Sequence, residues 1–380
     1  MSGILDGIGS SLHTIFFFVV AISILVSVHE FGHFWVGRRC GVKVEVFSIG
    51  FGRELFGWTD RLGTRWRISM LPLGGYVRFF GDADATSARA QGCDFSESER
   101  RTTYQGQSVG RRAAIAAAGP AANFLLAVVI FFGLFVTVGQ PFTPPVLDRV
   151  LPGSAAEAAG IRQGDRVLSV DGRSVESFEE LRLLMRLNQG TPVSLEVQRA
   201  GETLTVPVTP TIVEIDDGQG GKQKVGQLGV APSGLEFKQR GVGDSIWYAV
   251  REVGTVVHVT TTAVGQMISG SRGTEELGGP LRIADLSGRV AREGVESFVW
   301  LIAALSINLG LFNLLPVPML DGGHLLFYAF EAMRGRPLGD RIQEIGFRIG
   351  LALVLTLMIF TTLNDLVRLK VLGFIGRLFT

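Results

Sequence analysis

Residues 14–36 read TIFFFVVAISILVSVHEFGHFWV, a run without Lys, Arg or Asp. Most of these residues are apolar or small, and about 20 such residues are enough for a helix to cross the hydrocarbon layer of a bilayer. The segment has neither the basic start nor the small-residue cleavage site of a secretory signal peptide. We therefore predict that it forms a first transmembrane helix that the chain retains.

Three further apolar segments have the length of membrane spans, at residues 113–138, 298–315 and 349–363. The chain of 380 residues is 47% hydrophobic and only 19% charged, and its mean hydropathy is +0.33. Such values are typical of membrane proteins. The net charge of +1 gives no general attraction to nucleic acid, so a nucleic-acid partner is not expected. The expected fold class is a polytopic α-helical membrane protein with four transmembrane helices.

Basic residues indicate how these spans are oriented. The residues that flank the first loop, or lie between spans three and four, are Arg38, Arg39, Lys43, Arg111, Arg112, Arg334, Arg336 and Arg341. Cytoplasmic loops carry an excess of Lys and Arg. We therefore expect both loops in the cytoplasm and the long central region on the opposite side of the membrane.

One more segment, residues 245–268, is fairly apolar but contains Arg251, Glu252 and His258. Three such side chains are costly inside a bilayer. We interpret the segment as a helix at the membrane surface rather than as a fifth span.

The first span contains the motif His29-Glu30-Phe31-Gly32-His33, which matches H-E-x-x-H. On a helix, positions i and i+4 share a face, so both imidazoles can reach one ion. Two histidines and a carboxylate with one open position are typical of catalytic zinc. Glu30 projects beside them and can take a proton from water. Ionisable residues in an apolar span need partners, and a bound metal would provide them.

The strongest candidate for the third ligand is Asp321, in the stretch NLLPVPMLDGGH that begins at Asn313. Spans one and three run in the same direction, so their C-terminal ends lie on the same face of the membrane. Asp321 can therefore meet His29 and His33. The alternative is an ordinary cap or turn aspartate before Gly322. His324 remains a rival or auxiliary ligand, whereas His13 looks incidental.

Together these motifs resemble the site-2 protease family of intramembrane metalloproteases, of the bacterial type that includes the regulator of sigma-E protease. The matching stretches are the H-E-x-x-H motif, Gly119-Pro120-Ala121-Ala122-Asn123, and Asn313 through Gly322. The resemblance implies that His29, His33 and Asp321 bind Zn²⁺ and that Glu30 is the catalytic base. Further candidates for substrate binding or support of the site are Asn313, Asn123, Pro316, Pro318, Gly322, Gly74 and Gly75.

The segment 42–82 contains strand-like runs at VKVEVF, WRIS and GYVRFF, separated by glycines that favour turns. The resemblance implies a β-sheet that dips into the membrane beside the zinc. An exposed strand edge there could pair with an unwound substrate segment. The alternative is a solvated cytoplasmic hairpin.

Residues 144–212 alternate strand and helix signals. We expect a strand at 166–170, a turn at Asp171-Gly172, a helix at 178–188, and a hairpin at 194–208 that turns at Ala200-Gly201. This pattern resembles one PDZ domain, a module that binds extended peptides by strand addition. A β extension follows at 213–235. The family often carries two PDZ domains, and this chain departs from that pattern.

These observations give a domain scheme and a function. The expected segments are a first transmembrane helix (1–37), a cytoplasmic loop with the re-entrant sheet (38–112), a second helix (113–139), a periplasmic PDZ domain (140–240), a membrane-associated helical segment (241–296), a third helix (297–317), the Asp321 motif with a cytoplasmic loop (318–348), and a fourth helix with a tail (349–380). We expect an intramembrane zinc metalloendopeptidase that cuts transmembrane segments near the cytoplasmic side, in regulated intramembrane proteolysis.

The expected partners are the lipid bilayer, a peptide or substrate segment at the PDZ domain, and single-span membrane proteins, such as an anti-sigma factor or a remnant signal peptide. One alternative is a non-catalytic PDZ scaffold with a structural zinc, in which Glu30 would be dispensable. A metal transporter is a third reading, but it would need more polar residues along spans two and four.

Overall fold

The computed structural model describes residues 2–82, 95–188, 190–216, 222–270, 278–336 and 338–368. The chain divides into two compact units. The first comprises Met1–Phe131, Ala249–Thr260 and Thr274–Thr380, and the second comprises Phe132–Tyr248 and Thr261–Gly273. Each unit is described by itself below.

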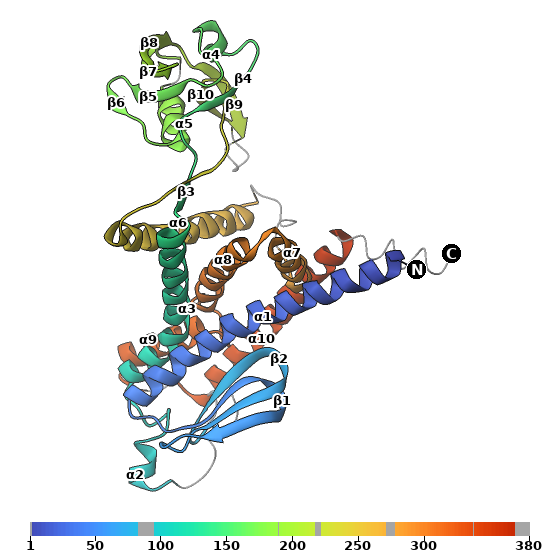
Figure 1. Cartoon of the computed structure of the whole chain (residues 1–380). Coiled ribbons are helices and arrows are strands. Elements are labelled where there is room, and N and C mark those ends of the chain that lie inside the picture. Colours follow the sequence, from blue (N-terminus) through green and yellow to red (C-terminus); the bar gives the residue numbers. More distant parts are fainter. Residues whose placement is uncertain are drawn as a thin grey trace. The chain divides into compact units, whose positions relative to one another are not determined.

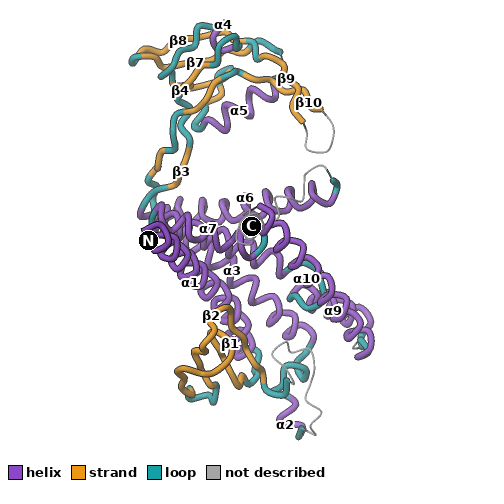
Figure 2. The backbone as a smooth tube through the Cα atoms, turned by 90° about the vertical axis from the view of Figure 1, so that its right-hand side faces the viewer, coloured by secondary structure: helices purple, strands orange, loops and turns teal. Residues whose placement is uncertain are grey.

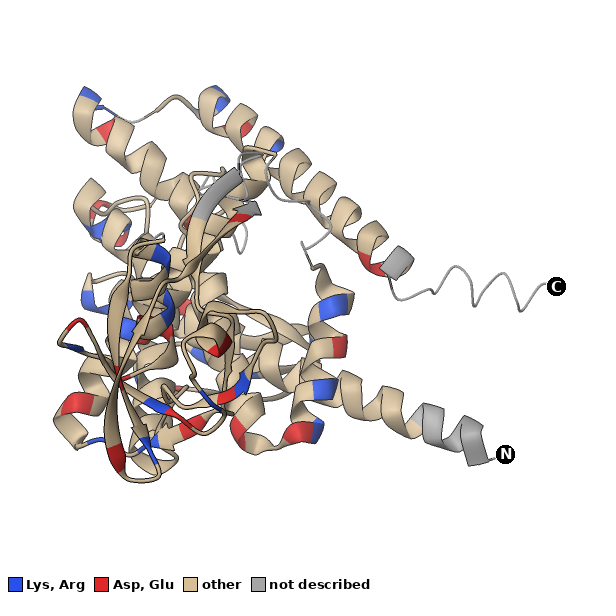
Figure 3. Cartoon of the chain, turned by 90° about the horizontal axis from the view of Figure 1, so that it is seen from above, with Lys and Arg blue, Asp and Glu red and all other residues tan. Residues whose placement is uncertain are grey.

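Four helices in the described ranges are long and apolar enough to cross a membrane. They are α1 (Ser2–Arg39), α3 (Val109–Thr137), α8 (Val295–Asn313) and α10 (Asp340–Arg368). The four predicted spans lie within these helices or overlap them closely, and α10 begins at Asp340, before the expected loop ends at residue 348. The charged residues of α10 lie near its two ends, with a long uncharged stretch between them (Figure 3).

The shorter helices are α2 (Glu97–Arg100), α6 (Val242–Ile268), α7 (Pro280–Glu293) and α9 (Asp321–Arg334). Helix α6 matches the expected helix at 245–268 and is not among the four candidate spans. Within residues 318–348, which were expected to hold the Asp321 motif and a cytoplasmic loop, the structure has helix α9 and the start of α10. Helix α9 ends at Gly335, whose φ of 68° stops the helix in the left-handed region.

The helices of the first unit pack through small residues and one buried cap. A Cβ at Gly288 of α7 would lie 2.2 Å from the Thr14 hydroxyl of α1, so the two helices approach closely. At the N-terminus of α7, the buried carboxylate of Asp365 in α10 accepts the backbone N–H groups of Gly279 and Arg282 at 3.1 and 3.0 Å. These contacts join α1, α7 and α10 (Figure 1).

The segment after α1 folds as one long hairpin of β1 (Val44–Thr59) and β2 (Arg65–Phe79) (Figure 2). The hairpin curls over itself, so residues 44–49 pair with 75–79 on one side and with 65–68 on the other, while 54–59 pair with 65–69. Three separate strands were expected here. Two of them are parts of a single strand, β2, and the sequence reading missed the strand at 54–59, where Gly57 interrupts the alternation of apolar and polar residues.

A polar network fastens the turn of this hairpin to the end of α1. The Asp60 carboxylate accepts hydrogen bonds from the Arg38 guanidinium, from the Trp66 indole at 2.9 Å, and from the Thr64 amide at 3.1 Å. Burial would raise the pKa of Asp60, but these hydrogen bonds outweigh it and lower the pKa from 3.8 to about 2. The carboxylate is therefore held in its charged form.

This network predicts a pH dependence of stability. Because the folded pKa of Asp60 lies below its ordinary value, the stabilisation is complete above about pH 4 and is lost as the pH falls towards 2. We expect Asp60→Asn to lower the melting temperature by a few degrees at pH 7, and the difference from the wild type to shrink below pH 4. Thermal unfolding in detergent at several pH values measures this difference in melting temperature. The control is Asp148→Asn, at an exposed position. An equal difference at pH 7 and pH 2.5 would contradict the assignment.

The second unit is a small α/β module. Its central sheet has the order β6-β5-β7-β8, and three two-stranded ribbons accompany it. The elements are β3 (Gln140–Phe142), β4 (Leu147–Val150), α4 (Ala155–Ala158), β5 (Arg166–Val170), β6 (Arg173–Ser174), α5 (Phe178–Leu187), β7 (Val193–Arg199), β8 (Glu202–Val208), β9 (Thr211–Asp216), β10 (Lys222–Gln227), β11 (Val230–Pro232) and β12 (Glu236–Lys238).

The predicted strand, turn, helix and hairpin of this unit are all present. Asp171 and Ala200 have φ values of 49° and 50° at the two expected turns. The core lies between α5 and the sheet, where Val167, Leu195 and Val197 are fully buried. Alternate residues of β7 point to this core, as the period of a half-buried strand requires.

Candidate metal centre

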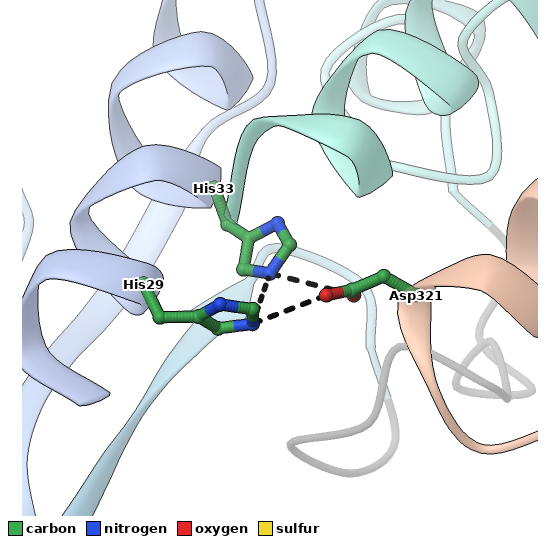
Figure 4. Close-up of side chains that lie close together, drawn as sticks. All are labelled: His29, His33 and Asp321. Atoms are coloured by element: carbon green, nitrogen blue, oxygen red, sulfur yellow. Dashed lines mark hydrogen bonds and ion pairs between the residues drawn. The ribbon is translucent and has the colours of Figure 1, made fainter. Parts of the chain in front are cut away.

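Three side chains from two distant parts of the chain meet in the first unit (Figure 4). His29 and His33 lie one turn apart on α1, and their Nε2 atoms are 3.2 Å apart. Asp321 is the first residue of α9, with Oδ2 at 3.1 Å from His29 Nε2 and Oδ1 at 3.5 Å from His33 Nε2. The structure thus brings together the three residues that the sequence indicated.

The donor set and its spacing fit zinc. In a tetrahedral site with bonds of about 2.0–2.1 Å to nitrogen or oxygen, neighbouring ligand atoms lie roughly 3.3 Å apart. The three observed separations bracket that value. Asp321 Oδ2 is buried without a hydrogen bond of proper geometry, as expected for an atom whose partner is an ion. Two imidazoles and a carboxylate leave one position open, which is the arrangement of catalytic zinc sites.

The charge of Asp321 suits this role. Burial would raise the pKa of its carboxyl group, but the neighbouring His33 and His29 outweigh burial and hold that pKa below its ordinary value. The group therefore remains a carboxylate, the form that binds metal.

The far nitrogens of both imidazoles have partners that orient the rings. His33 Nδ1 lies 2.8 Å from the carbonyl oxygen of Ile115 and donates to it, which leaves Nε2 with a free lone pair. His29 Nδ1 lies 3.1 Å from the side-chain amide of the fully buried Asn123, whose Oδ1 has no hydrogen bond. Rotating that amide by 180° places its oxygen against Nδ1–H, the tautomer that leaves His29 Nε2 free for metal. This contact fits the supporting role that was predicted for Asn123.

Glu30 lies beside the three ligands without joining them. Its Oε2 accepts the backbone N–H of Val77 at 3.1 Å, and a Cβ at Gly75 would lie 3.8 Å from its Cγ. The carboxylate is thus held against strand β2. Its second oxygen can accept a proton from water at the open position, which is the geometry of a general base.

Two glycines allow α1 and α3 to approach at the level of the ligands. A Cβ at Gly32 would lie 2.3 Å from the carbonyl oxygen of Ala118, and one at Gly119 would lie 2.3 Å from His33 Nε2. Pro120 follows inside α3 and removes one backbone N–H from the helix. Gly119 belongs to a motif that the sequence indicated, and the structure gives the reason for it, which is the room that the imidazoles need.

The turn before Asp321 is strained and tightly seated. Met319 has a φ of 87°, in the left-handed region that a side chain disfavours. Behind the turn, a Cβ at Gly350 of α10 would lie 1.8 Å from the carbonyl oxygen of Pro318, and one at Gly323 would lie 2.3 Å from that of Val317. The sequence reading missed both Met319 and Gly350. The spacing of Gly346 and Gly350 was the available signal, since small residues four apart mark close helix contacts.

The other predicted residues lie at the end of α8, in the turn before α9, at the start of α9 and in the hairpin. Asn313 ends α8, Pro316 and Pro318 lie in the turn that leads to Asp321, and Gly322 packs against the carbonyl of Leu314. Gly74, with a φ of 133°, lies against the Phe51 ring in the hairpin.

The remaining histidines lie outside the three-residue group. His324 is one turn beyond Asp321, and burial lowers its pKa, so it is neutral. His13 contacts Phe17 near the start of α1, and His258 lies on α6.

Comparisons with known proteins agree with this centre. Residues 17–357 match the family model described as Peptidase family M50. "Putative zinc metalloprotease Atu1380" of Agrobacterium fabrum is 45% identical, with 92% of this chain and 94% of that protein aligned. "Metalloprotease MmpA" of Caulobacter vibrioides is 39% identical over 94% of this chain and 96% of its own. Among solved structures, the PDZ domain of an SdrC-like protein from Listeria innocua covers 25% of this chain and 98% of its own, with 16% identity and a TM-score of 0.20, too low to carry an argument.

Proposed function

Because the chain belongs to peptidase family M50, the site-2 protease family, we propose that it hydrolyses peptide bonds within transmembrane segments of other membrane proteins. Family membership makes it a membrane-bound zinc metallopeptidase with membrane proteins as substrates. The observation that carries the proposal is the convergence of His29, His33 and Asp321, two of them inside a candidate span and the third at the start of α9.

We assign the zinc ligands to His29 Nε2, His33 Nε2 and the Asp321 carboxylate. Zinc held there would lower the pKa of water at the site to about 7 and polarise the substrate carbonyl. Glu30 takes the proton of the attacking water and returns it to the leaving amine nitrogen. Asn123 and the carbonyl of Ile115 keep the two imidazoles in the ligand tautomer throughout.

Strand β2 provides a place for an extended substrate. Among the described residues, 75–79 pair with 44–49 on one side only, and the Val77 N–H points the other way, to Glu30. A transmembrane helix shields its peptide bonds, so it must unwind before water can attack. An unwound segment that pairs along this edge would bring its backbone past Glu30.

The apolar surface of the hairpin supports its place in the membrane. Leu55, Phe56, Trp58 and Leu62 expose between 48 and 70% of their surface. Exposed side chains of this kind on one hairpin favour contact with lipid. We place the hairpin and the metal centre near the cytoplasmic side of a bacterial inner membrane, as the distribution of basic residues indicates.

We place the second unit in the periplasm as a PDZ domain. A cavity of about 150 Å³ lies between α5 and residues 225–230 and is lined by Leu181, Met185, Val225 and Leu228. Gly229, with a φ of 78°, lies just before β11 and also lines the cavity. A peptide end with an apolar last side chain fits this groove. Single-span proteins, such as an anti-sigma factor or a remnant signal peptide, are the proposed substrates.

Metal removal tests the proposed function. We expect the purified protein in detergent to cut a single-span reporter protein within its transmembrane segment, to lose this activity when zinc is chelated, and to regain it when zinc is added. Mass spectrometry of the products locates the cut bond. Cleavage that survives complete removal of zinc, or cuts that fall only outside the transmembrane segment, would overturn the proposal.

A further inference from the structure

A buried polar cluster joins α3 to α9 away from the three ligand atoms. It consists of Tyr104, Arg112, Tyr328 and Glu331, and we call it the α3–α9 clamp. Arg112 Nη2 donates to Glu331 Oε1 at 2.6 Å, and each side chain is only 11% exposed. The hydroxyls of Tyr104 and Tyr328 lie 2.8 Å apart, and the Arg112 guanidinium lies 4.9 Å from the centre of the Tyr328 ring.

Burial of an ion pair needs an explanation. Removing both charges from water costs several kcal/mol, and apolar side chains of similar size often stabilise a fold equally well or better. Directional bonds provide something that apolar contacts lack, because they fix how two helices are rotated and shifted against each other. Arg112 lies near the start of α3 and Glu331 near the end of α9, so their bond fixes these two helices.

Each helix in the clamp also holds part of the metal centre. One turn beyond Arg112, the carbonyl of Ile115 accepts the hydrogen bond that orients His33. Two turns before Tyr328, α9 begins with Asp321. A shift of α9 against α3 would therefore move the carboxylate away from the imidazole.

The clamp also contacts β2, the strand that holds Glu30. The ring of Tyr104 stacks on Phe79 of β2, with centroids 5.4 Å apart and an interplanar angle of 12°. Two residues earlier on the same strand, the Val77 amide donates to Glu30. The same four residues thus connect α3, α9 and β2.

We propose that the α3–α9 clamp positions the metal centre, and that Arg112 and Glu331 are positioning residues for zinc binding and catalysis. The proposal rests on the ligand assignment made above. The clamp residues do not belong to the group of ligand atoms, so they act through α3, α9 and β2.

Zinc affinity is the readout that separates positioning from the reaction itself. Zinc affinity of the full-length protein in detergent is measured by competition with a chelator of known affinity. We expect Glu331→Gln to bind zinc 10- to 100-fold more weakly than the wild type, an effect of the size found for residues that support metal ligands. The matched control is Glu344→Gln, which removes the same charge from an exposed pair with Arg348 at 2.8 Å on α10. This control should bind zinc like the wild type.

A double variant separates positioning from stability. Arg112→Met with Glu331→Leu replaces the pair by apolar side chains and should unfold at the wild-type temperature or above. It should still bind zinc at least tenfold more weakly, because the directional bond is gone. Wild-type affinity in this variant would overturn the proposal, and so would a Glu331→Gln variant that binds zinc normally.

The ligand variant Asp321→Asn serves as reference in the same titration. If Asp321→Asn loses zinc while both clamp variants bind it normally, the clamp proposal fails and the ligand assignment stands. If Asp321→Asn binds zinc like the wild type, the ligand assignment fails and the clamp proposal fails with it.

Discussion

Replacing Glu30 by Gln should reduce peptide hydrolysis roughly a thousandfold while zinc binding stays within about twofold of the wild type. Gln has the shape of Glu and can keep a polar contact with the Val77 amide, but it cannot take a proton from water. Since Glu30 is not among the three converging ligand atoms, the metal should remain. The measurement pairs cleavage of a single-span reporter with the zinc content of the same preparation.

A matched control for this variant lies on the neighbouring hairpin. Glu45 of β1 forms an ion pair with Arg78 at 3.0 Å, and Glu45→Gln removes an equal charge from the same part of the protein. Its activity should stay close to that of the wild type. Hydrolysis at the wild-type rate by Glu30→Gln would show that another group is the base, and loss of zinc would show that Glu30 is a ligand.

Gly119→Ala, which adds one methyl group, should reduce peptide hydrolysis about as strongly as Glu30→Gln does. The cause differs, because this variant should lose zinc. An alanine Cβ there would lie 2.3 Å from His33 Nε2 and 2.8 Å from His29 Cε1, which is closer than atoms can approach. One or both imidazoles must move off the metal position. We expect Gly119→Ala to weaken zinc binding by a factor on the order of 100 or more, with loss of hydrolysis.

The same substitution elsewhere on α3 provides the control. A Cβ at Gly133 would meet nothing within 4 Å, and alanine is the better helix former. Gly133→Ala should therefore bind zinc normally and melt at the same temperature or slightly higher. Normal zinc binding by Gly119→Ala would mean that the two imidazoles do not lie against this part of α3.

The membrane-spanning helices could be predicted from the sequence because each one is recognised from its own residues. A bilayer demands runs of about 20 apolar residues, and each run can be read without knowledge of its neighbours. The proposed ligand set could be predicted from the topology as well. Spans that run in the same direction bring the motif of α1 and the residue after α8 to one face of the membrane. Asp321 lies beside His29 and His33 as that argument requires.

What the sequence did not reveal depends on contacts between distant segments. The hairpin curls so that Phe47 pairs with both Val77 and Trp66. The alternation of apolar and polar residues along one strand does not show which two segments will pair with it. Helix α9 was not predicted, because the stretch between spans three and four was used only for the topology signal of its basic residues. The role of Gly119 appears only when the imidazoles of another helix are placed against it.

The placement of the metal ligands also has a consequence for the order of biosynthesis. Two of the proposed ligands and the proposed base belong to α1, which is made first, while Asp321 follows about 290 residues later. At roughly 5–20 residues per second, a ribosome needs on the order of 15 to 60 seconds to cover that distance. During this interval the growing chain already has its first span but lacks the third ligand. A nascent protease of this design is therefore inert towards other proteins at its site of insertion until nearly the whole chain has been made.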